Sequence, residues 1–410
     1  MRISLIIVKN IIRDVEMMYR MRCSTLDILL LCISFYEFID MPHSLFLLIK
    51  YTIIAYLFFL HCGECKKMQR IVISILVYGG ITFIATIVRQ NMLNRYVASF
   101  VYMLHILTIY VTVSAFVRFR GIEDLIKCLT KILLALAIIT DVPMLFINYN
   151  FSSPAEKYLI GNKFVVSYLH CFLIALLFGH YDEKKSRRQV TLRIGRVFFL
   201  LFSIIICIRV TCTTGMLICL FMGVMIYTPF PLKIKKFLST PKVIIIGTAI
   251  INVLMLGSSS LLTTPYIASF ISNVLGKSYT WVGRLHIYAM IFDVIRTHLW
   301  FGYGYFSNII EDILGFGNAQ NGVLKVLVDS GIIGLVGYTS LVYYSIKKSV
   351  SVSIEEWSLI AFVYCMVVAS IVEINLTDYL FFLTIAMIFS AGQNKKIIDN
   401  RRYETERGKM

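Results

Sequence analysis

The chain has 410 residues, of which 58% are hydrophobic and 15% are charged. Soluble domains are usually about 45–50% apolar and about 25% charged, so this composition excludes an ordinary soluble protein. The net charge of +17 would suit a nucleic-acid-binding protein, but surplus Lys and Arg in the cytoplasmic loops of a membrane protein explain it better. We therefore predict no nucleic-acid partner.

Apolar runs that are long enough to cross a bilayer, which takes about 20 residues, follow one another along the whole chain. They predict an all-α polytopic membrane protein with about twelve transmembrane helices and a single transmembrane domain over residues 1–410. The predicted spans are 24–40, 43–61, 71–88, 97–117, 125–148, 164–180, 194–210, 214–230, 242–259, 322–345, 358–374 and 377–392.

The basic residues divide unequally between the two sides of this arrangement. If the N-terminus is inside, the cytoplasmic segments hold 30 of the 40 Lys and Arg residues. The positive-inside rule then places both termini in the cytoplasm of a bacterial cell. It also places residues 260–321, the large loop between the ninth and tenth spans, on the outer face of the cytoplasmic membrane. We treat this loop as part of the same domain.

The outer loop gathers polar residues that the rest of the chain lacks. Its middle, residues 281–300, is amphipathic and aromatic, which predicts a helix in contact with membrane lipid at the surface. Helical spacing places Arg284 and Tyr288 on one face, and His286 and Asp293 on nearly the opposite face. We therefore predict Arg284 as a site residue and interpret His286 with Asp293 as a surface or structural pair.

Besides Arg284 and Arg296 in the large loop, three arginines are predicted on the outer side, against the general charge distribution. Arg89 and Arg95 flank the third and fourth spans, and Arg209 ends the seventh span before a tight polar hairpin. Arginine binds phosphate through two parallel hydrogen bonds, so an anionic ligand such as a lipid-linked phosphate would explain them. Contact with lipid headgroups explains Arg89 and Arg95 equally well, and both readings stay open.

The start of the tenth span carries a second group of polar residues. Gln320 and Asn321 are amides at a helix N-terminus, where free N–H groups favour anions, although capping alone would explain one of them. Lys325 and Asp329 are four residues apart and are expected to pair. Gly302 and Gly304 are expected to end the preceding helix in a sharp turn, because no βαβ context supports a dinucleotide-binding motif.

Several motifs together resemble the O-antigen ligase and Wzy-type polymerase superfamily. They are Gly-Arg at 283–284, Trp-Phe-Gly-Tyr-Gly-Tyr-Phe at 300–306, Gln-Asn at 320–321 and Gly-Ile-Ile-Gly-Leu at 331–335. The resemblance implies a GT-C-like membrane fold and metal-independent glycosyl transfer without a cofactor. The implied substrates are undecaprenyl-diphosphate-linked oligosaccharides, and a chain-length regulator protein is a further candidate partner.

The resemblance favours a polymerase of O-antigen, capsule or exopolysaccharide, because Gln320 stands where ligases of the family have a histidine. Glycan ligase and lipid-linked oligosaccharide flippase remain the alternatives. Arg284 and Arg209 are the expected catalytic residues, since they could balance the charge of the leaving diphosphate. The expected substrate-binding residues are Tyr288, Gln320, Asn321 and Lys325. Candidates for a general base are Glu311, Asp312 and His298.

Overall fold

The computed structural model describes residues 24–38, 41–146, 158–179, 188–257, 278–347 and 353–407, without the side chains of 188–193, 278–286, 354–355 and 395–407. Within these ranges the regular structure is helical. The elements are α2 (Thr25–Ile33), α3 (His43–His61), η1 (Cys62–Lys67), α4 (Gln69–Arg89), α5 (Leu93–Arg120), α6 (Ile122–Phe146), α7 (Lys163–Gly179), α8 (Arg188–Arg209), α9 (Thr213–Tyr227), α10 (Leu232–Leu238), α11 (Pro241–Gly257), α14 (Ser278–Thr297), α15 (Ile309–Leu314), α16 (Gly322–Ile346), α17 (Ile354–Ala369), η2 (Asn375–Thr377) and α18 (Tyr379–Arg407).

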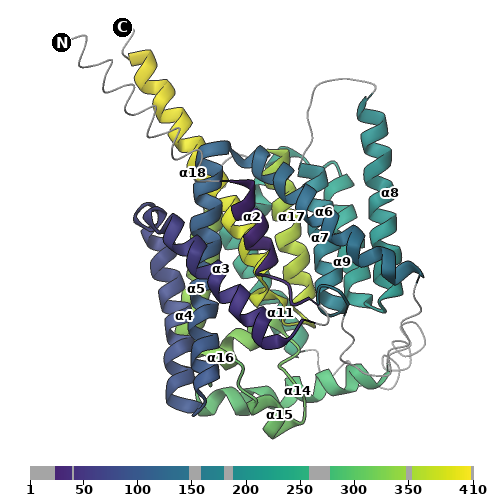
Figure 1. Ribbon diagram of the computed structural model, residues 1–410. Coiled ribbons are helices and arrows are strands. Elements are labelled where there is room, and N and C mark those ends of the chain that lie inside the picture. Colours follow the sequence, from purple (N-terminus) through teal and green to yellow (C-terminus); the bar gives the residue numbers. More distant parts are fainter. Residues whose placement is uncertain are drawn as a thin grey trace, which may run out of the picture.

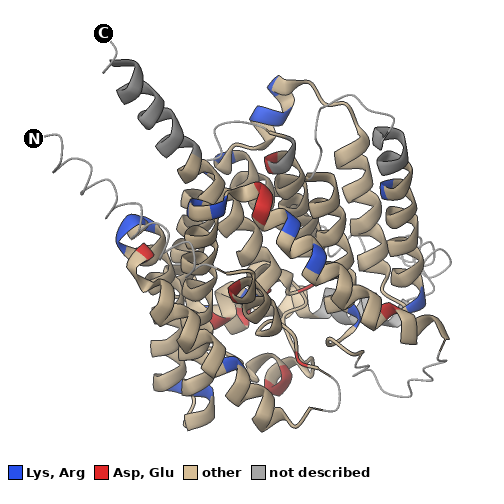
Figure 2. Cartoon of the chain, turned by 45° about the horizontal axis from the view of Figure 1, so that its top comes forward, with Lys and Arg blue, Asp and Glu red and all other residues tan. Residues whose placement is uncertain are grey.

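The long helices stand side by side, while α14 and α15 lie across one end of the bundle (Figure 1). We call this the α14 end. The start of α2 and the end of α18 both lie at the opposite end (Figure 1). Lys and Arg residues lie mainly toward the ends of the helices (Figure 2). This arrangement suits helices that turn back and forth across one apolar layer.

Four of the described helices are long and apolar enough to cross a membrane, and α10 with α11 forms a fifth candidate bent by 66°. The four are α3 continued by η1, α4, α5 and α16. Shorter apolar helices lie at Lys163–Gly179, Thr213–Tyr227, Glu356–Ala369 and Tyr379–Asn394. The chain is therefore an all-helical membrane protein, and the count of about twelve spans stays a prediction.

The first predicted span, 24–40, is a helix only over Thr25–Ile33. The helix ends there because Ser34 turns its hydroxyl back to the carbonyl oxygen of Leu31, at 2.6 Å. Such local side-chain hydrogen bonds compete with the regular helical pattern. The same hydroxyl lies 2.9 Å from Nε2 of His105 in α5, so Ser34 also joins two helices.

Helix α5 is the centre of the core. Every residue from His105 to Val117 is buried, whichever side of the helix it occupies. A helix that is buried on all sides must be surrounded by other helices, and α5 packs against α3, α4, α6 and α18. Helix α4 in turn packs against α16. Because α4 packs against both α5 and α16, it positions α16 and the loop before it relative to the core.

Candidate functional site

Helix α16 is interrupted at Gly331, whose φ of 62° and ψ of −166° are not helical. A break of this kind releases backbone N–H and C=O groups from their partners within the helix. In the apolar layer of a membrane protein each unpaired group costs several kcal/mol, so other parts of the protein have to satisfy it. The partners of α16 come from a loop that precedes it in sequence.

Residues 298–306, which we call the motif loop, dock into this break. Four backbone hydrogen bonds join the loop to α16, two donated in each direction. They run from Tyr303 N to Val328 O (2.8 Å), Gly304 N to Asp329 O (2.9 Å), Ile332 N to Leu299 O (2.9 Å) and Ile333 N to Trp300 O (3.2 Å). The aromatic motif at 300–306 therefore completes a broken membrane helix.

Two glycines of the motif loop make this approach possible. Gly302 has a φ of 72°, and a Cβ atom there would lie 2.6 Å from the backbone C of Asp329. Gly304 has a φ of 90°, and its Cβ would lie 2.6 Å from Cα of Thr86 in α4. Both the left-handed backbone and the close contact require glycine. The predicted sharp turn is confirmed, and its reason is the packing of the loop between α4 and α16.

Helix α14 confirms the helix that was predicted in the middle of the 260–321 loop. The described residues on the face that carries Tyr288 are buried. Tyr288 is 2% exposed, and its hydroxyl donates to the carbonyl oxygens of Gln320 (2.9 Å) and Ile371 (2.8 Å). The Tyr288 hydroxyl therefore anchors α14 to the start of α16. Arg284 lies one turn earlier in α14 on this face. Its side chain is outside the described part, so its role stays a prediction.

The opposite face of α14 is exposed. Asp293 lies 3.8 Å from Arg296, and both side chains are about four-fifths exposed, at 79% and 80%. Asp293 thus has Arg296 as a described ion-pair partner. The side chain of His286, its predicted partner, lies outside the described residues. An exposed pair of this kind contributes little to stability.

The two amide residues at the start of α16, Gln320 and Asn321, have different roles. Asn321 is fully buried, and its Oδ1 accepts hydrogen bonds from the backbone N of Val323 and Leu324, both at 3.0 Å. Its Nδ2 donates to Oδ1 of Asn252 at 2.7 Å. Asn321 is therefore the N-cap of α16. Gln320 has a left-handed φ of 50° and is partly exposed, which leaves its side chain nearer the surface.

The predicted pairing of Lys325 with Asp329 is confirmed. Lys325 Nζ lies 2.7 Å from Oδ1 of Asp329, and the two side chains are 15% and 4% exposed. The ammonium group also lies 5.9 Å from the centre of the Phe306 ring, in the motif loop. A largely buried ion pair in the first half of α16 thus lies beside the motif loop. Whether Lys325 also binds substrate stays a prediction.

Arg209 ends α8 and is exposed. The polar hairpin predicted after it is confirmed, because α9 begins at Thr213 and Thr211 has a left-handed φ of 53°. The Sγ atom of Cys212 accepts from the backbone N of Gly215 at 3.3 Å and caps α9. The hairpin therefore presents Arg209 at the surface, as a role in charge stabilisation would need.

Arg89 and Arg95, two further arginines that were predicted on the outer side, contact the two ends of the motif loop. Nη1 of Arg89 lies 3.0 Å from Nε2 of His298, where the loop begins. Arg95 donates to Oε1 of Gln90 (3.0 Å) and to Oδ1 of Asn308, just after the loop (3.2 Å). The sequence singled out both arginines but not these partners, of which His298 and Asn308 are more than 200 residues away along the chain.

His298, one candidate for a general base, is partly buried beside Arg89. Partial burial, followed by the positive charge of Arg89, lowers the pKa of His298 below its usual value of 6.5. The ring is therefore neutral near pH 7. Glu311 and Asp312, the other candidates, are exposed on α15.

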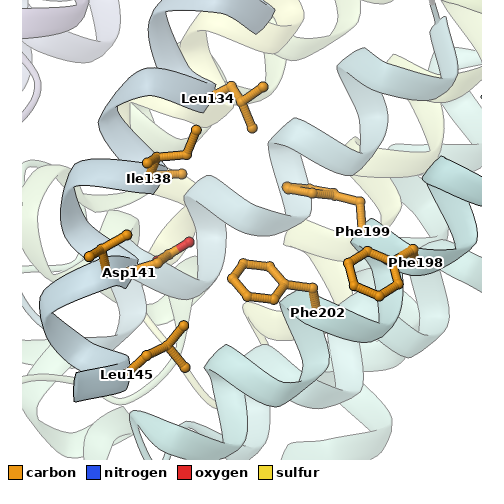
Figure 3. Close-up of a pocket in the computed structure, with 9 residues that line it drawn as sticks. Leu134, Ile138, Asp141, Leu145, Phe198, Phe199 and Phe202 are labelled. Carbon is orange, nitrogen blue, oxygen red and sulfur yellow. The ribbon is translucent and has the colours of Figure 1, made fainter.

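A buried cluster that sequence reasoning missed joins α6, α7 and α8. His170 is fully buried, with Nε2 3.1 Å from Oδ1 of Asp141 and Nδ1 3.1 Å from Oγ of Ser203. Asp141 also borders a cavity of about 230 Å³, whose other lining residues are apolar, among them Phe199 and Phe202 (Figure 3). The three polar residues lie on three helices, so no local spacing could have predicted the cluster.

Lys50 is held inside the bundle by aromatic residues. Its Nζ donates to the hydroxyl of Tyr379 at 3.2 Å and lies 4.7 Å from the centre of that ring. The ring of His105 lies on the same tyrosine, with ring centres 4.1 Å apart. These contacts give Lys50 a structural role, because a cation over an aromatic face is stabilised electrostatically.

The fold and site define a helical membrane protein in which an aromatic, glycine-containing loop completes a broken helix. Residues 197–339 match a protein family described as O-antigen ligase. This segment contains Arg209, Arg284, the motif loop and the first half of α16. This match supports the resemblance to the O-antigen ligase and Wzy-type polymerase superfamily that the motifs indicated. A search of curated proteins finds no match.

Proposed function

We propose that the protein is a glycosyltransferase that joins undecaprenyl-diphosphate-linked oligosaccharide units on the outer face of the cytoplasmic membrane. The observation that carries the proposal is the family match over residues 197–339. The same segment holds both predicted catalytic arginines. The membrane helices support an active site close to the lipid-anchored diphosphate of such a substrate.

In the proposed reaction, a hydroxyl group of the acceptor sugar attacks the anomeric carbon of the donor glycan. A new glycosidic C–O bond forms as the bond between that carbon and the diphosphate oxygen breaks. Undecaprenyl diphosphate leaves with the electron pair, and the hydroxyl proton passes to a base. Arg284 and Arg209 are proposed to stabilise the leaving diphosphate by charge-assisted hydrogen bonds, without a metal.

The residues around α16 take different parts in this proposal. The buried hydroxyl of Tyr288 and the side chain of Asn321 are committed to backbone and amide partners. They position the site. Gln320 and Lys325 are each partly exposed and are the proposed contacts to the saccharide. Their amide and ammonium groups can donate to sugar hydroxyls.

The proposed placement in the membrane has about twelve spans, with both termini in the cytoplasm and the α14 end outside. The uneven distribution of basic residues supports it, because 30 of the 40 Lys and Arg residues then lie in cytoplasmic segments. A chain-length regulator protein in the same membrane is a proposed partner. The position of α2 and α18 at the end opposite α14 suits this topology.

Polymerase and ligase are both supported by a specific observation. The family that matches is described as O-antigen ligase, which favours transfer of the finished glycan to another acceptor. Ligases of the family have a histidine at the position that Gln320 occupies in this chain. A glutamine cannot act as a general base, so this departure from the ligase pattern favours a polymerase. We propose the polymerase as the main function and the ligase as its alternative. A flippase would fit the membrane helices but not the family.

The size distribution of surface glycan in a strain without the gene tests the proposal. A polymerase predicts that single repeat units still reach the surface but long chains disappear. Complete loss of surface glycan would instead identify a ligase or a flippase. Complementation with Arg284→Ala is expected to leave single repeats, whereas Arg296→Ala, on the exposed face of α14, is expected to restore long chains. Unchanged chain length in Arg284→Ala would refute the catalytic assignment.

A further inference from the structure

The connection between α4 and α5 carries two arginines whose side-chain partners are all neutral. Arg89 contacts His298, and Arg95 contacts Gln90 and Asn308. Among the residues that the structure describes, no carboxylate oxygen lies within 4.0 Å of either guanidinium group. Other arginines of the chain do have such a partner, for example Arg118, which lies 2.9 Å from Glu64.

These neutral partners orient the two guanidinium groups without cancelling their charge. Gln90 is buried, and its Nε2 donates to the carbonyl oxygens of Tyr303 (3.0 Å) and Tyr305 (3.1 Å). Its Oε1 is therefore turned toward Arg95. A glutamine held by two backbone carbonyls is a fixed support, so Arg95 is positioned in advance. Positioning a cation before its ligand arrives lowers the entropic cost of binding.

The histidine adds a hydrogen-bond donor to this group. Arginine can only donate, so Nε2 of His298 must accept the hydrogen bond from Arg89. The proton of the neutral ring is then on Nδ1, which becomes a donor toward any further ligand. The two arginines and His298 Nδ1 thus offer N–H donors and positive charge at the two ends of the motif loop. This is the chemistry that recognises a phosphate or diphosphate.

The group is separate from Arg284, the first of the predicted catalytic arginines. His298 follows directly after α14, whose last residue is Thr297. At about 1.5 Å per residue, the helical positions of Arg284 and Thr297 are about 20 Å apart along the axis. The two basic places therefore lie toward opposite ends of one helix, and one diphosphate cannot span them.

We propose that Arg89 and Arg95, with His298, bind the diphosphate of a second lipid-linked glycan, the acceptor. This inference rests on the proposed function, in which a donor and an acceptor, each carrying a diphosphate, must meet at one face of the membrane. With the donor diphosphate at Arg284, the acceptor diphosphate sits about 20 Å away. The acceptor saccharide bridges that distance and brings its far hydroxyl to the donor.

Binding of undecaprenyl diphosphate to the full-length protein in nanodiscs tests the site. The wild type is expected to bind two molecules per chain, and the Arg89→Gln/Arg95→Gln variant one. Arg89→Gln alone is expected to weaken the second site by about tenfold or more, because a charge-assisted hydrogen bond contributes about 1.5–3 kcal/mol. Arg89 is exposed, so this variant should fold normally. Arg296→Gln, an exposed arginine that has its own acidic partner, is the matched control.

Two further probes separate the sources of phosphate. Inorganic diphosphate should compete for the second site, and phosphatidylglycerol vesicles should not. Equal competition by phosphatidylglycerol would identify a lipid-headgroup site and overturn the proposal. Unchanged stoichiometry and affinity in both variants would overturn it as well. Because this assay measures binding and the proposed function is tested by glycan length, either can fail while the other stands.

Discussion

Replacing Gly302 by alanine should release the motif loop from the break in α16. A Cβ atom at this position would lie 2.6 Å from three backbone atoms, the C of Asp329, the N of Ser330 and the O of Val328. Backbone atoms of a packed helix cannot move aside as a flexible side chain can. The φ of 72° adds strain, since residues with a Cβ rarely adopt it.

The expected extent of undocking follows from comparing the strain in the docked loop with the stabilisation from its hydrogen bonds. Left-handed backbone costs about 1–2 kcal/mol, and forcing a methyl group into a packed site costs about 1–3 kcal/mol, so a docked loop would carry about 2–5 kcal/mol of strain. The four backbone hydrogen bonds that hold the loop contribute about 0.5–1.5 kcal/mol each, or about 2–6 kcal/mol together. Because the two ranges overlap, the loop should undock for much of the time.

The assay has two readouts. Thermal unfolding of the purified Gly302→Ala protein should show a lower midpoint than the wild type. Glycan length in a complemented deletion strain should fall, with transfer reduced by up to about tenfold for each 1.4 kcal/mol lost from the docked state. Gly317→Ala is the matched control, because nothing lies within 4 Å of a Cβ there and Gly317 is not among the left-handed glycines.

Wild-type stability and wild-type glycan length in Gly302→Ala would refute the reasoning. That result would mean that the loop tolerates a side chain against the α16 backbone, and so that the observed docking does not support the site. Equal losses in Gly302→Ala and Gly317→Ala would also count against it, since the effect would then come from replacing any glycine. Only a loss specific to Gly302 supports the docked loop.

Three more predictions follow. Lys325→Met should destabilise the protein by about 3–5 kcal/mol, because it leaves the Asp329 carboxylate buried and unpaired, whereas Lys325→Met/Asp329→Leu should regain stability in thermal unfolding. If the double variant regained activity too, Lys325 would not bind substrate. The lowered pKa of His298 predicts stability that is full above about pH 6.5 and is lost as pH falls below it, as a protonated ring repels Arg89. The midpoint of His298→Asn should vary less over this range, and equal slopes would contradict the assignment. A periplasmic reporter enzyme inserted after Gly317 should be active, and activity of a cytoplasmic reporter there would overturn the topology.

The local features of this protein could be predicted from its sequence because they depend on neighbours along the chain. Helical spacing alone placed Tyr288 on the buried face of α14 and predicted the pairing of Lys325 with Asp329, four residues apart. The glycine pattern at 302 and 304 predicted a sharp turn, and the composition predicted membrane helices. The amide of Asn321 was recognised as a candidate cap, although its full burial was not foreseen.

Contacts between distant segments were decided only by the tertiary structure. The spacing of residues 298–306 does not show that their backbone completes the helix broken at Gly331. An unpaired backbone carbonyl cannot be recognised from the sequence. His298, the partner of Arg89, and Asn308, one partner of Arg95, are equally remote, more than 200 residues away. Periodicity reports which face of a helix is buried, but the choice of partner depends on how the helices pack. The sequence therefore determined which residues could form a site, and the packing of α4, α14 and α16 decided which of them meet.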